Sequence, residues 1–154
     1  MITVNHLTKR YGSHLAVDDI SFTVQDGEIV GFLGPNGAGK STTMKAILNL
    51  IRRDEGDIQI FGKDNIQNEL EVKEKIGVVF DTMNLPEMLQ AQDVGKMMRS
   101  LYRQWDPAKY AQYLEQFELP AKKTIKDFSR GMKMKLAIAV ALSHNAQLLL
   151  LDEA

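Results

Sequence analysis

Apolar residues recur along the chain with the two periods that distinguish strands from helices. Residues 2–4 and residues 20–24 alternate between apolar and polar, which is the period of strands with one buried face. Gly12 and Ser13 supply a turn signal between the two runs. The pattern therefore predicts two strands near the N-terminus, separated by a short turn.

Three further segments, residues 29–33, 78–80 and 148–151, are apolar without alternation. Continuous apolar runs of this length are typical of strands buried on both faces of a parallel sheet. We therefore expect three buried strands in addition to the N-terminal pair.

Helical periods fall between these runs. Apolar positions at i, i+3, i+4 and i+7 over residues 44–51, and a longer stripe of methionine and aromatic residues over 94–105, predict two amphipathic helices. The second stripe is expected to form core or a surface for a partner protein.

Two further helices are predicted from their first residues. Asp106 followed by Pro107 is typical of an N-cap and a first helical position, and the helix that they begin ends at Pro120. Ser129 is placed to cap a last helix over residues 130–143, whose middle is apolar nearly all round. The alternation of strands and helices indicates the α/β class with a helical insertion.

Composition narrows the class of protein only modestly. The chain has 154 residues, of which 44% are hydrophobic and 25% charged, with a formal net charge of -1 and no cysteine. These values allow one globular domain, and the lack of cysteine excludes disulfides. The net charge does not indicate a nucleic-acid-binding protein. The apolar runs fall short of the roughly 20 residues that span a bilayer, and the N-terminus has no signal-peptide core. We expect a cytoplasmic protein that meets a membrane only through a partner.

The segment GPNGAGKST, residues 34–42, fits the pattern G-x-x-x-x-G-K-[ST]. Glycines let consecutive backbone N–H groups turn toward an anion, and the start of the following helix adds unpaired N–H groups. The ammonium of Lys40 can reach terminal phosphates, and the hydroxyl of Ser41 can complete a Mg²⁺ shell. We therefore predict a nucleotide phosphate loop formed by Gly34, Asn36, Gly37, Ala38, Gly39, Lys40, Ser41 and Thr42. The alternative is a glycine-rich turn with an incidental lysine, which the preceding apolar run and the following amphipathic helix disfavour.

Other stretches resemble the ATP-binding domain of ABC transporters. Residues 128–132, Phe-Ser-Arg-Gly-Met, resemble the family's signature sequence, which is usually LSGGQ. Residues 148–153, four leucines followed by Asp and Glu, resemble its second nucleotide motif, and residues 5–12 and 18–22 resemble its N-terminal strands. The order and spacing of these motifs make the resemblance specific.

The resemblance covers essentially the whole chain and implies an architecture. It implies one ABC-type nucleotide-binding domain over residues 1–154, of class α/β, with a P-loop NTPase core and an N-terminal antiparallel β subdomain. A helical insertion is expected over about residues 85–128.

Family roles carry over to matching positions. The resemblance implies that Tyr11 stacks on adenine, that Asp152 holds Mg²⁺, and that Glu153 polarises the attacking water. Ser129 and Gly131 would face the γ-phosphate bound by a second nucleotide-binding domain. The alternatives are a tyrosine that packs at a strand end and two solvated carboxylates.

Three positions depart from the family pattern. Arg130 stands where the signature has glycine, Met132 stands where it has glutamine, and Asp81 stands where a glutamine usually touches the metal. An aspartate remains an oxygen ligand but lacks the amide donor, so Asp81 is a metal ligand or an ordinary loop residue.

Six basic residues gather near the signature: Lys122, Lys123, Lys126, Arg130, Lys133 and Lys135. A nucleic-acid patch is one interpretation, but no stacking aromatic residues interleave with them, which favours a solvated face. The three histidines have no metal-ligand spacing, and no role is assigned to them.

Family members continue past the acidic pair, with a strand that ends in a histidine contacting the γ-phosphate. The resemblance therefore implies that the C-terminal part of the sheet is missing, in a fragment or a naturally short relative. We expect weak or no turnover from the chain itself.

The expected function of the complete protein is hydrolysis of Mg-ATP that drives a membrane permease. The form SRGMK is similar to ATPases of two-component exporters of drugs, peptides or lipids. The alternatives are a non-transport ABC protein that acts on ribosomes or DNA, and a regulatory module that binds nucleotide without hydrolysis.

Overall fold

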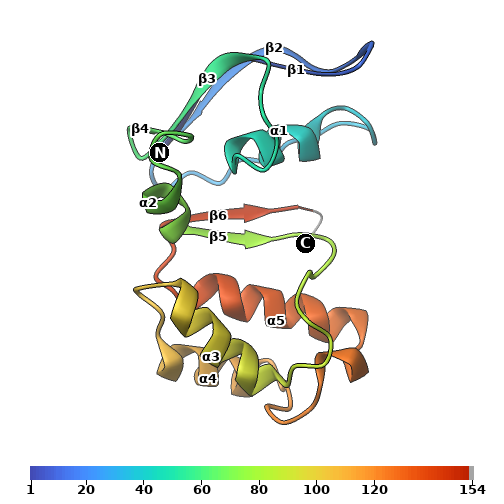
Figure 1. Cartoon of the computed structure of the whole chain (residues 1–154), viewed down its shortest axis with the longest axis vertical. Coiled ribbons are helices and arrows are strands. Elements are labelled where there is room, and N and C mark those ends of the chain that lie inside the picture. Colours follow the sequence, from blue (N-terminus) through green and yellow to red (C-terminus); the bar gives the residue numbers. More distant parts are fainter. Residues whose placement is uncertain (153–154) are drawn as a thin grey trace. The chain divides into compact units, whose positions relative to one another are not determined.

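The chain folds into two compact units in a computed structural model that describes residues 1–152 (Figure 1). The first unit spans Met1–Lys73, and the second begins at Glu74. Each unit contains its own sheet and its own buried apolar residues.

The first unit is built on a four-stranded antiparallel sheet in the order β2-β1-β3-β4. Its strands are β1 (Ile2–Tyr11), β2 (His14–Val24), β3 (Glu55–Ile60) and β4 (Lys63–Asp64). Gly12, at a φ of 59°, forms the turn between β1 and β2, a left-handed conformation that glycine adopts readily. The two N-terminal strands and their turn were predicted, whereas β3 and β4 were not.

Helix α1 (Lys40–Ile47) contributes Met44 and Ile47 to the core of this unit. The predicted amphipathic pattern ran to residue 51, but the helix ends at Ile47, with Leu48 as its C-cap. The side-chain amide of Asn65, which is 2% exposed, donates to the carbonyl oxygens of Ala46 and Ile47 at 2.9 and 2.8 Å. The Ala46 carbonyl also accepts a bond from the Asn49 N–H at 3.1 Å, so the Asn65 amide adds a second bond there and one to Ile47 at the helix end. A short helix, α2 (Glu69–Glu74), follows.

Residues 29–33 do not form the predicted buried strand. They are irregular, and Ile29 and Leu33 are fully or almost fully exposed, at 102% and 96%. A central strand needs hydrogen-bonding neighbours, and among residues 1–152 neither sheet includes this segment. Phe32 alone makes an aromatic contact, with its ring 5.2 Å from that of Phe22.

The second unit contains a parallel pair of strands, β5 (Ile76–Val79) and β6 (Leu148–Leu151). Helix α5 (Arg130–Leu142) covers one face of the pair, and a Cβ atom at Gly77 would come within 2.6 Å of the Ala141 carbonyl oxygen (Figure 1). The two strands were predicted, but full burial of β6 is wrong. Leu149 and Leu151 are 43% and 54% exposed because this helix covers only one face of the pair.

Three helices and a helical turn form the core of the second unit. The elements beside α5 are α3 (Ala91–Leu101), α4 (Pro107–Gln116) and the 3-10 turn η1 (Ile125–Asp127). As predicted, Asp106 caps α4, accepting a bond from the Lys109 N–H at 3.0 Å. The Tyr110 hydroxyl donates to the Ala91 carbonyl at 2.7 Å, which joins α4 to α3. Within the described part of the chain, no helix has the length and apolarity that crossing a bilayer requires.

Candidate functional site

The predicted phosphate loop is an irregular segment that leads directly into α1. Its turn is closed by a hydrogen bond from the Ala38 N–H to the Pro35 carbonyl at 3.2 Å. Gly37 and Gly39 both have left-handed backbone conformations, with φ of 83° and 88°. Glycine therefore meets a backbone requirement at two of the three glycine positions of the motif.

Gly39 also lies at a close approach between α1 and the sheet. A Cβ atom at this position would come within 2.4 Å of the Ala16 carbonyl oxygen on β2. Gly39 is the N-cap of α1, and with no side chain it leaves the first N–H groups of the helix uncapped. The first turn carries no acidic residue, so the helix start keeps its partial positive charge for an anion.

Two side chains of the first turn of α1 bond to carbonyl oxygens of the loop. The Lys40 ammonium donates to the carbonyl oxygens of Gly34 and Pro35 at 2.7 and 2.9 Å, so its charge lies over the loop. The hydroxyl of the buried Thr43 donates to the Gly39 carbonyl at 2.9 Å, which stabilises the first turn of the helix. Ser41 lies between them on the first turn, half-buried.

Tyr11 ends β1 and pairs with His14 across the turn into β2. Its side chain is 48% exposed and therefore half buried, which fits both stacking on a base and packing at a strand end. The Lys9 ammonium lies 5.2 Å from the centroid of its ring, within cation–π range.

In the second unit, the parallel pairing of β5 and β6 brings two predicted metal ligands to one sheet edge. Asp81 follows β5, and Asp152 directly follows β6, where its N–H donates to the Val79 carbonyl at 2.8 Å. Ligands of α/β proteins bind beyond this carboxyl edge. Asp152 is half-buried and Asp81 is exposed. Glu153 lies outside the described residues.

Ser129 caps α5, with its hydroxyl oxygen accepting a bond from the Met132 N–H at 3.2 Å, as predicted. Gly131 lies in the first turn with no positive φ, and a Cβ atom there would meet only the Ser129 hydroxyl oxygen, at 4.0 Å. Neither the backbone conformation nor the packing around position 131 requires a glycine there.

Comparison with known proteins identifies the chain. The ABC transporter family model matches residues 17–154. The chain belongs to the ABC transporter family of ATP-binding proteins. It is 37% identical over 155 residues to the bacitracin transport ATP-binding protein BcrA of Bacillus licheniformis, covering 99% of this chain and 51% of that protein. It is also 37% identical over 159 residues to the linearmycin resistance ATP-binding protein LnrL of Bacillus subtilis, covering 99% of this chain and 51% of that protein.

Solved structures of ABC proteins share the fold. An ATP-binding subunit of an ABC transporter has a TM-score of 0.88 and 28% identity, over 97% of this chain and 65% of that one. A dimeric ATP-binding cassette in a post-hydrolysis state, bound to ADP and Pi, has a TM-score of 0.83 and 28% identity, over 98% and 73%. These findings confirm the predicted ABC-type α/β fold with its N-terminal antiparallel subdomain. The chain spans about half the length of curated relatives such as BcrA.

Asp81 and Arg130, two residues that differ from the usual family sequence, line the same cavity of about 490 Å³ in the second unit. Its lining is Phe80, Asp81, Thr82, Met83, Phe128, Arg130, Lys133, Met134 and Ala137. Lys133, taken from the sequence as part of a solvated basic face, pairs with Glu87 at 2.8 Å. That hydrogen bond and charge hold the pKa of Glu87 below its usual value.

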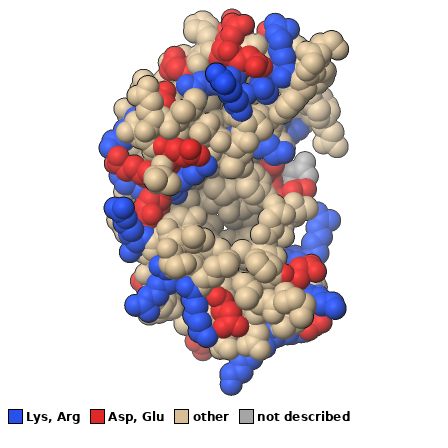
Figure 2. Space-filling model, viewed as in Figure 1, with Lys and Arg blue, Asp and Glu red and all other residues tan. Residues whose placement is uncertain are grey.

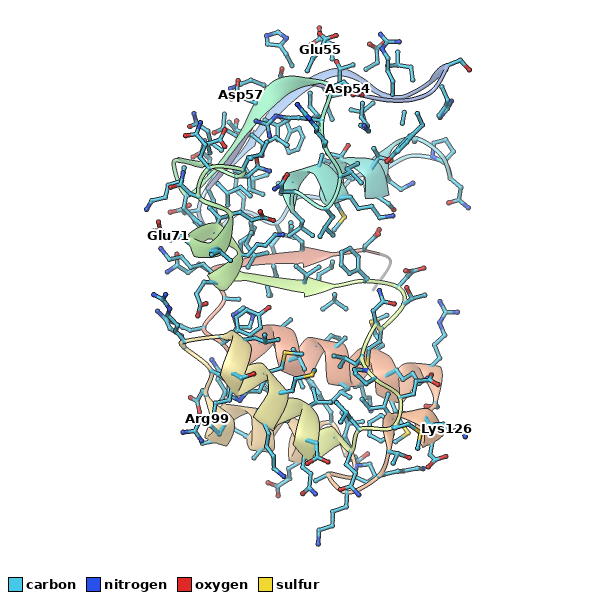
Figure 3. All side chains as sticks on the ribbon, in the orientation of Figure 1. Asp54, Glu55, Asp57, Glu71, Arg99 and Lys126 are labelled. Carbon is cyan, nitrogen blue, oxygen red and sulfur yellow. The ribbon has the colours of Figure 1, made fainter. Side chains whose placement is uncertain are left out.

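The remaining basic residues behave largely as the solvated-face interpretation expects. Lys126 points away from the helices into solvent (Figure 3). Positive and negative side chains are interspersed over the visible surface rather than gathered in a field of one sign (Figure 2).

Sequence reasoning missed Lys9 and His144. Lys9 lies two residues before Tyr11 on a strand, and this i, i+2 spacing signals a shared face. His144 is 1% exposed, stacks on Tyr102 with ring centroids 3.9 Å apart, and places Nδ1 3.2 Å from the Glu74 carbonyl oxygen. No local pattern in the sequence signals that burial.

Proposed function

We propose that this chain binds Mg-ATP and that, in the complete protein, it hydrolyses ATP to drive transport through a partner membrane permease. The observation that carries the proposal is the glycine loop that leads into an uncapped α1 with Lys40 at its first position. Family membership supports it, as do the names of relatives that act in bacitracin transport and linearmycin resistance.

The residues of the loop would bind the phosphates. Backbone N–H groups of the loop residues other than Pro35 and of the start of α1 would surround them, and the Lys40 ammonium would exchange its loop carbonyls for phosphate oxygens. Tyr11 would stack on the adenine base.

The residues expected to hold Mg²⁺ carry the oxygen donors that this ion prefers. The Ser41 hydroxyl and the Asp152 carboxylate are hard oxygen ligands of the kind that Mg²⁺ binds beside phosphates, and Asp81 is a further oxygen donor. When bound, the ion would neutralise charge that develops on the transferred phosphoryl group. Glu153 would orient the attacking water or accept its proton.

A second nucleotide-binding domain would complete the site. Ser129 and Gly131, at the start of α5, would face the γ-phosphate held by the partner, and similarity to a dimeric cassette supports this arrangement. The partner permease would hold the protein at the cytoplasmic face of a membrane.

Replacement of Lys40 tests ATP binding. Lys40→Met removes charge-assisted bonds worth about 1.5–3 kcal/mol each, so we expect Mg-ATP affinity to fall roughly tenfold or more by titration calorimetry. Lys45→Met, on an exposed position in the last turn of the same helix, is the matched control and should leave affinity unchanged. A folded chain that gives no heat of association with Mg-ATP would refute the proposal.

Hydrolysis and transport need separate tests in the complete protein. Phosphate release that is lost in Glu153→Gln supports an ATPase, whereas tight ATP binding without release favours a regulatory module. A neighbouring gene that encodes several membrane-spanning helices supports transport, and its absence favours a non-transport ABC protein.

A further inference from the structure

One face of the Tyr11 ring is already covered by a cation. Lys9 and Tyr11 lie on the same strand, and the Lys9 ammonium is 5.2 Å from the ring centroid. The Lys9 side chain is only 13% exposed, so the ammonium is held at the protein surface rather than extended into water. A base can therefore stack only on the other face of the ring.

Asp54 holds this cation in place. Its carboxylate lies 3.5 Å from the Lys9 ammonium and also accepts a bond from the Arg10 N–H at 2.6 Å. Figure 3 shows Asp54 where the chain enters β3, next to β1. The Arg10 N–H and the Lys9 charge hold the pKa of Asp54 below its usual value, so the carboxylate stays charged at neutral pH.

The backbone around this pair is also fixed. The Asp54 N–H donates to the Thr8 carbonyl at 3.0 Å, a main-chain bond on one side of the Lys9–Asp54 pair, and the Arg10 N–H bonds to the Asp54 carboxylate on the other side. The lysine on β1 is thus paired with the residue that directly precedes β3, whereas the side chain of Tyr11 at the strand end is half-exposed.

The hairpin that carries Tyr11 reaches the end of the unit where the phosphate loop lies. Tyr11 pairs with His14 on β2, and two residues further along β2 the Ala16 carbonyl contacts Gly39 of the loop (Figure 1). The hairpin and the phosphate loop therefore lie at the same end of the first unit.

We propose that Lys9, anchored by Asp54, is a positioning residue that orients the Tyr11 ring and leaves one face open for the purine base. The inference rests on the proposed ATP binding and adds two residues that fix the base rather than the phosphates. Pre-orienting the ring lowers the ordering cost of stacking, and a cation–π contact at an exposed site contributes about 0.5–1 kcal/mol.

The test compares a ligand that has a base with one that lacks it. Titration calorimetry with Mg-ATP and with magnesium tripolyphosphate is applied to the chain and to Lys9→Met. The variant removes the charge and keeps most of the apolar stem. We expect ATP affinity to fall roughly two- to fivefold, with tripolyphosphate affinity unchanged. Asp54→Asn should shift ATP in the same direction, and Lys9→Arg should restore it, because guanidinium also stacks on aromatic faces.

A matched control and a double mutant separate positioning from general charge effects. Lys63→Met removes another lysine of the same unit, one that pairs with Glu71, and should change neither affinity. In a Tyr11→Ala background, Lys9→Met should have no further effect on ATP affinity. If Lys9 had only a structural role, its replacement would lower ATP affinity in that background as well.

The outcomes separate this inference from the proposed function. If neither ligand binds the unmodified chain, ATP binding itself fails. If ATP binds but Lys9→Met leaves its affinity unchanged, lowers both affinities equally, or acts fully in the Tyr11→Ala background, the positioning role is overturned.

Discussion

Gly39 lies so close to Ala16 that a Cβ atom at position 39 would approach the Ala16 carbonyl oxygen to 2.4 Å. The contact joins the last glycine of the phosphate loop to β2, and the φ of 88° at Gly39 turns the chain into α1. The same residue therefore sets both the packing of the helix and the direction of its first N–H groups.

We expect Gly39→Ala to destabilise the chain and to abolish measurable Mg-ATP binding. The left-handed conformation alone costs an alanine about 1–2 kcal/mol, and the backbone clash adds to it. Gly12→Ala is the matched control, because Gly12 also has a positive φ, of 59°, but a Cβ atom there would meet nothing within 4 Å. Urea unfolding and calorimetry should show the larger loss for Gly39→Ala. Equal losses in the two variants would contradict the role assigned to the Ala16 contact.

Gly131→Ala should leave the fold intact and weaken nucleotide-dependent pairing. The space around Gly131 is open, and alanine favours a helix over glycine by about 1 kcal/mol, so unfolding stability should stay the same or rise. If Gly131 faces a nucleotide held by a partner, ATP-induced dimer formation in sedimentation experiments should fall.

Gly95→Ala provides the contrast for this prediction. A Cβ atom there would come within 2.7 Å of the Tyr110 ring, so the variant should lose stability. If Gly131→Ala leaves ATP-induced dimer formation unchanged, the proposed contact of Gly131 with a partner's nucleotide is contradicted.

Local chemistry made parts of the fold predictable. The Asp106–Pro107 and Ser129 signals placed the starts of α4 and α5 correctly because a cap bonds to backbone only three residues away. Strand β3 was missed because only Ile58 and Ile60 mark it, and these two residues pair with β1 residues that lie more than 50 positions earlier. Residues 29–33 show the opposite error: a strand was predicted there, but the segment has no neighbouring strand in either sheet of residues 1–152.

The candidate site was predictable to a similar extent. The phosphate loop follows from glycine and lysine spacing, and the structure adds the reasons for Gly37 and Gly39. The Lys133–Glu87 pair joins residues 46 positions apart, so no motif reveals it. The roles of Tyr11, Asp81 and Asp152 came from family resemblance and stay predictions.

The buried His144 should make unfolding stability depend on pH in mildly acid solution. Burial lowers the pKa of His144, and this effect outweighs the bond to the Glu74 carbonyl and the Glu74 charge, which act in the opposite direction. The unfolded chain therefore binds the proton first. The stability contribution is complete above the unfolded pKa of about 6.5 and is lost as pH falls below it.

We expect this slope to flatten in His144→Phe, measured by urea unfolding at several pH values between pH 7 and pH 5. One proton accounts for at most about 1.4 kcal/mol per pH unit. Phenylalanine keeps an aromatic ring against Tyr102 but cannot titrate, so the variant should be less stable at pH 7 yet less sensitive to acid. His14→Gln, at an exposed position beside the first turn, controls for the loss of a histidine and should keep the original slope. Carboxylates with lowered pKa values, such as Glu87 and Asp64, titrate further into acid, so a slope that survives in His144→Phe above pH 5 would assign the effect to another group.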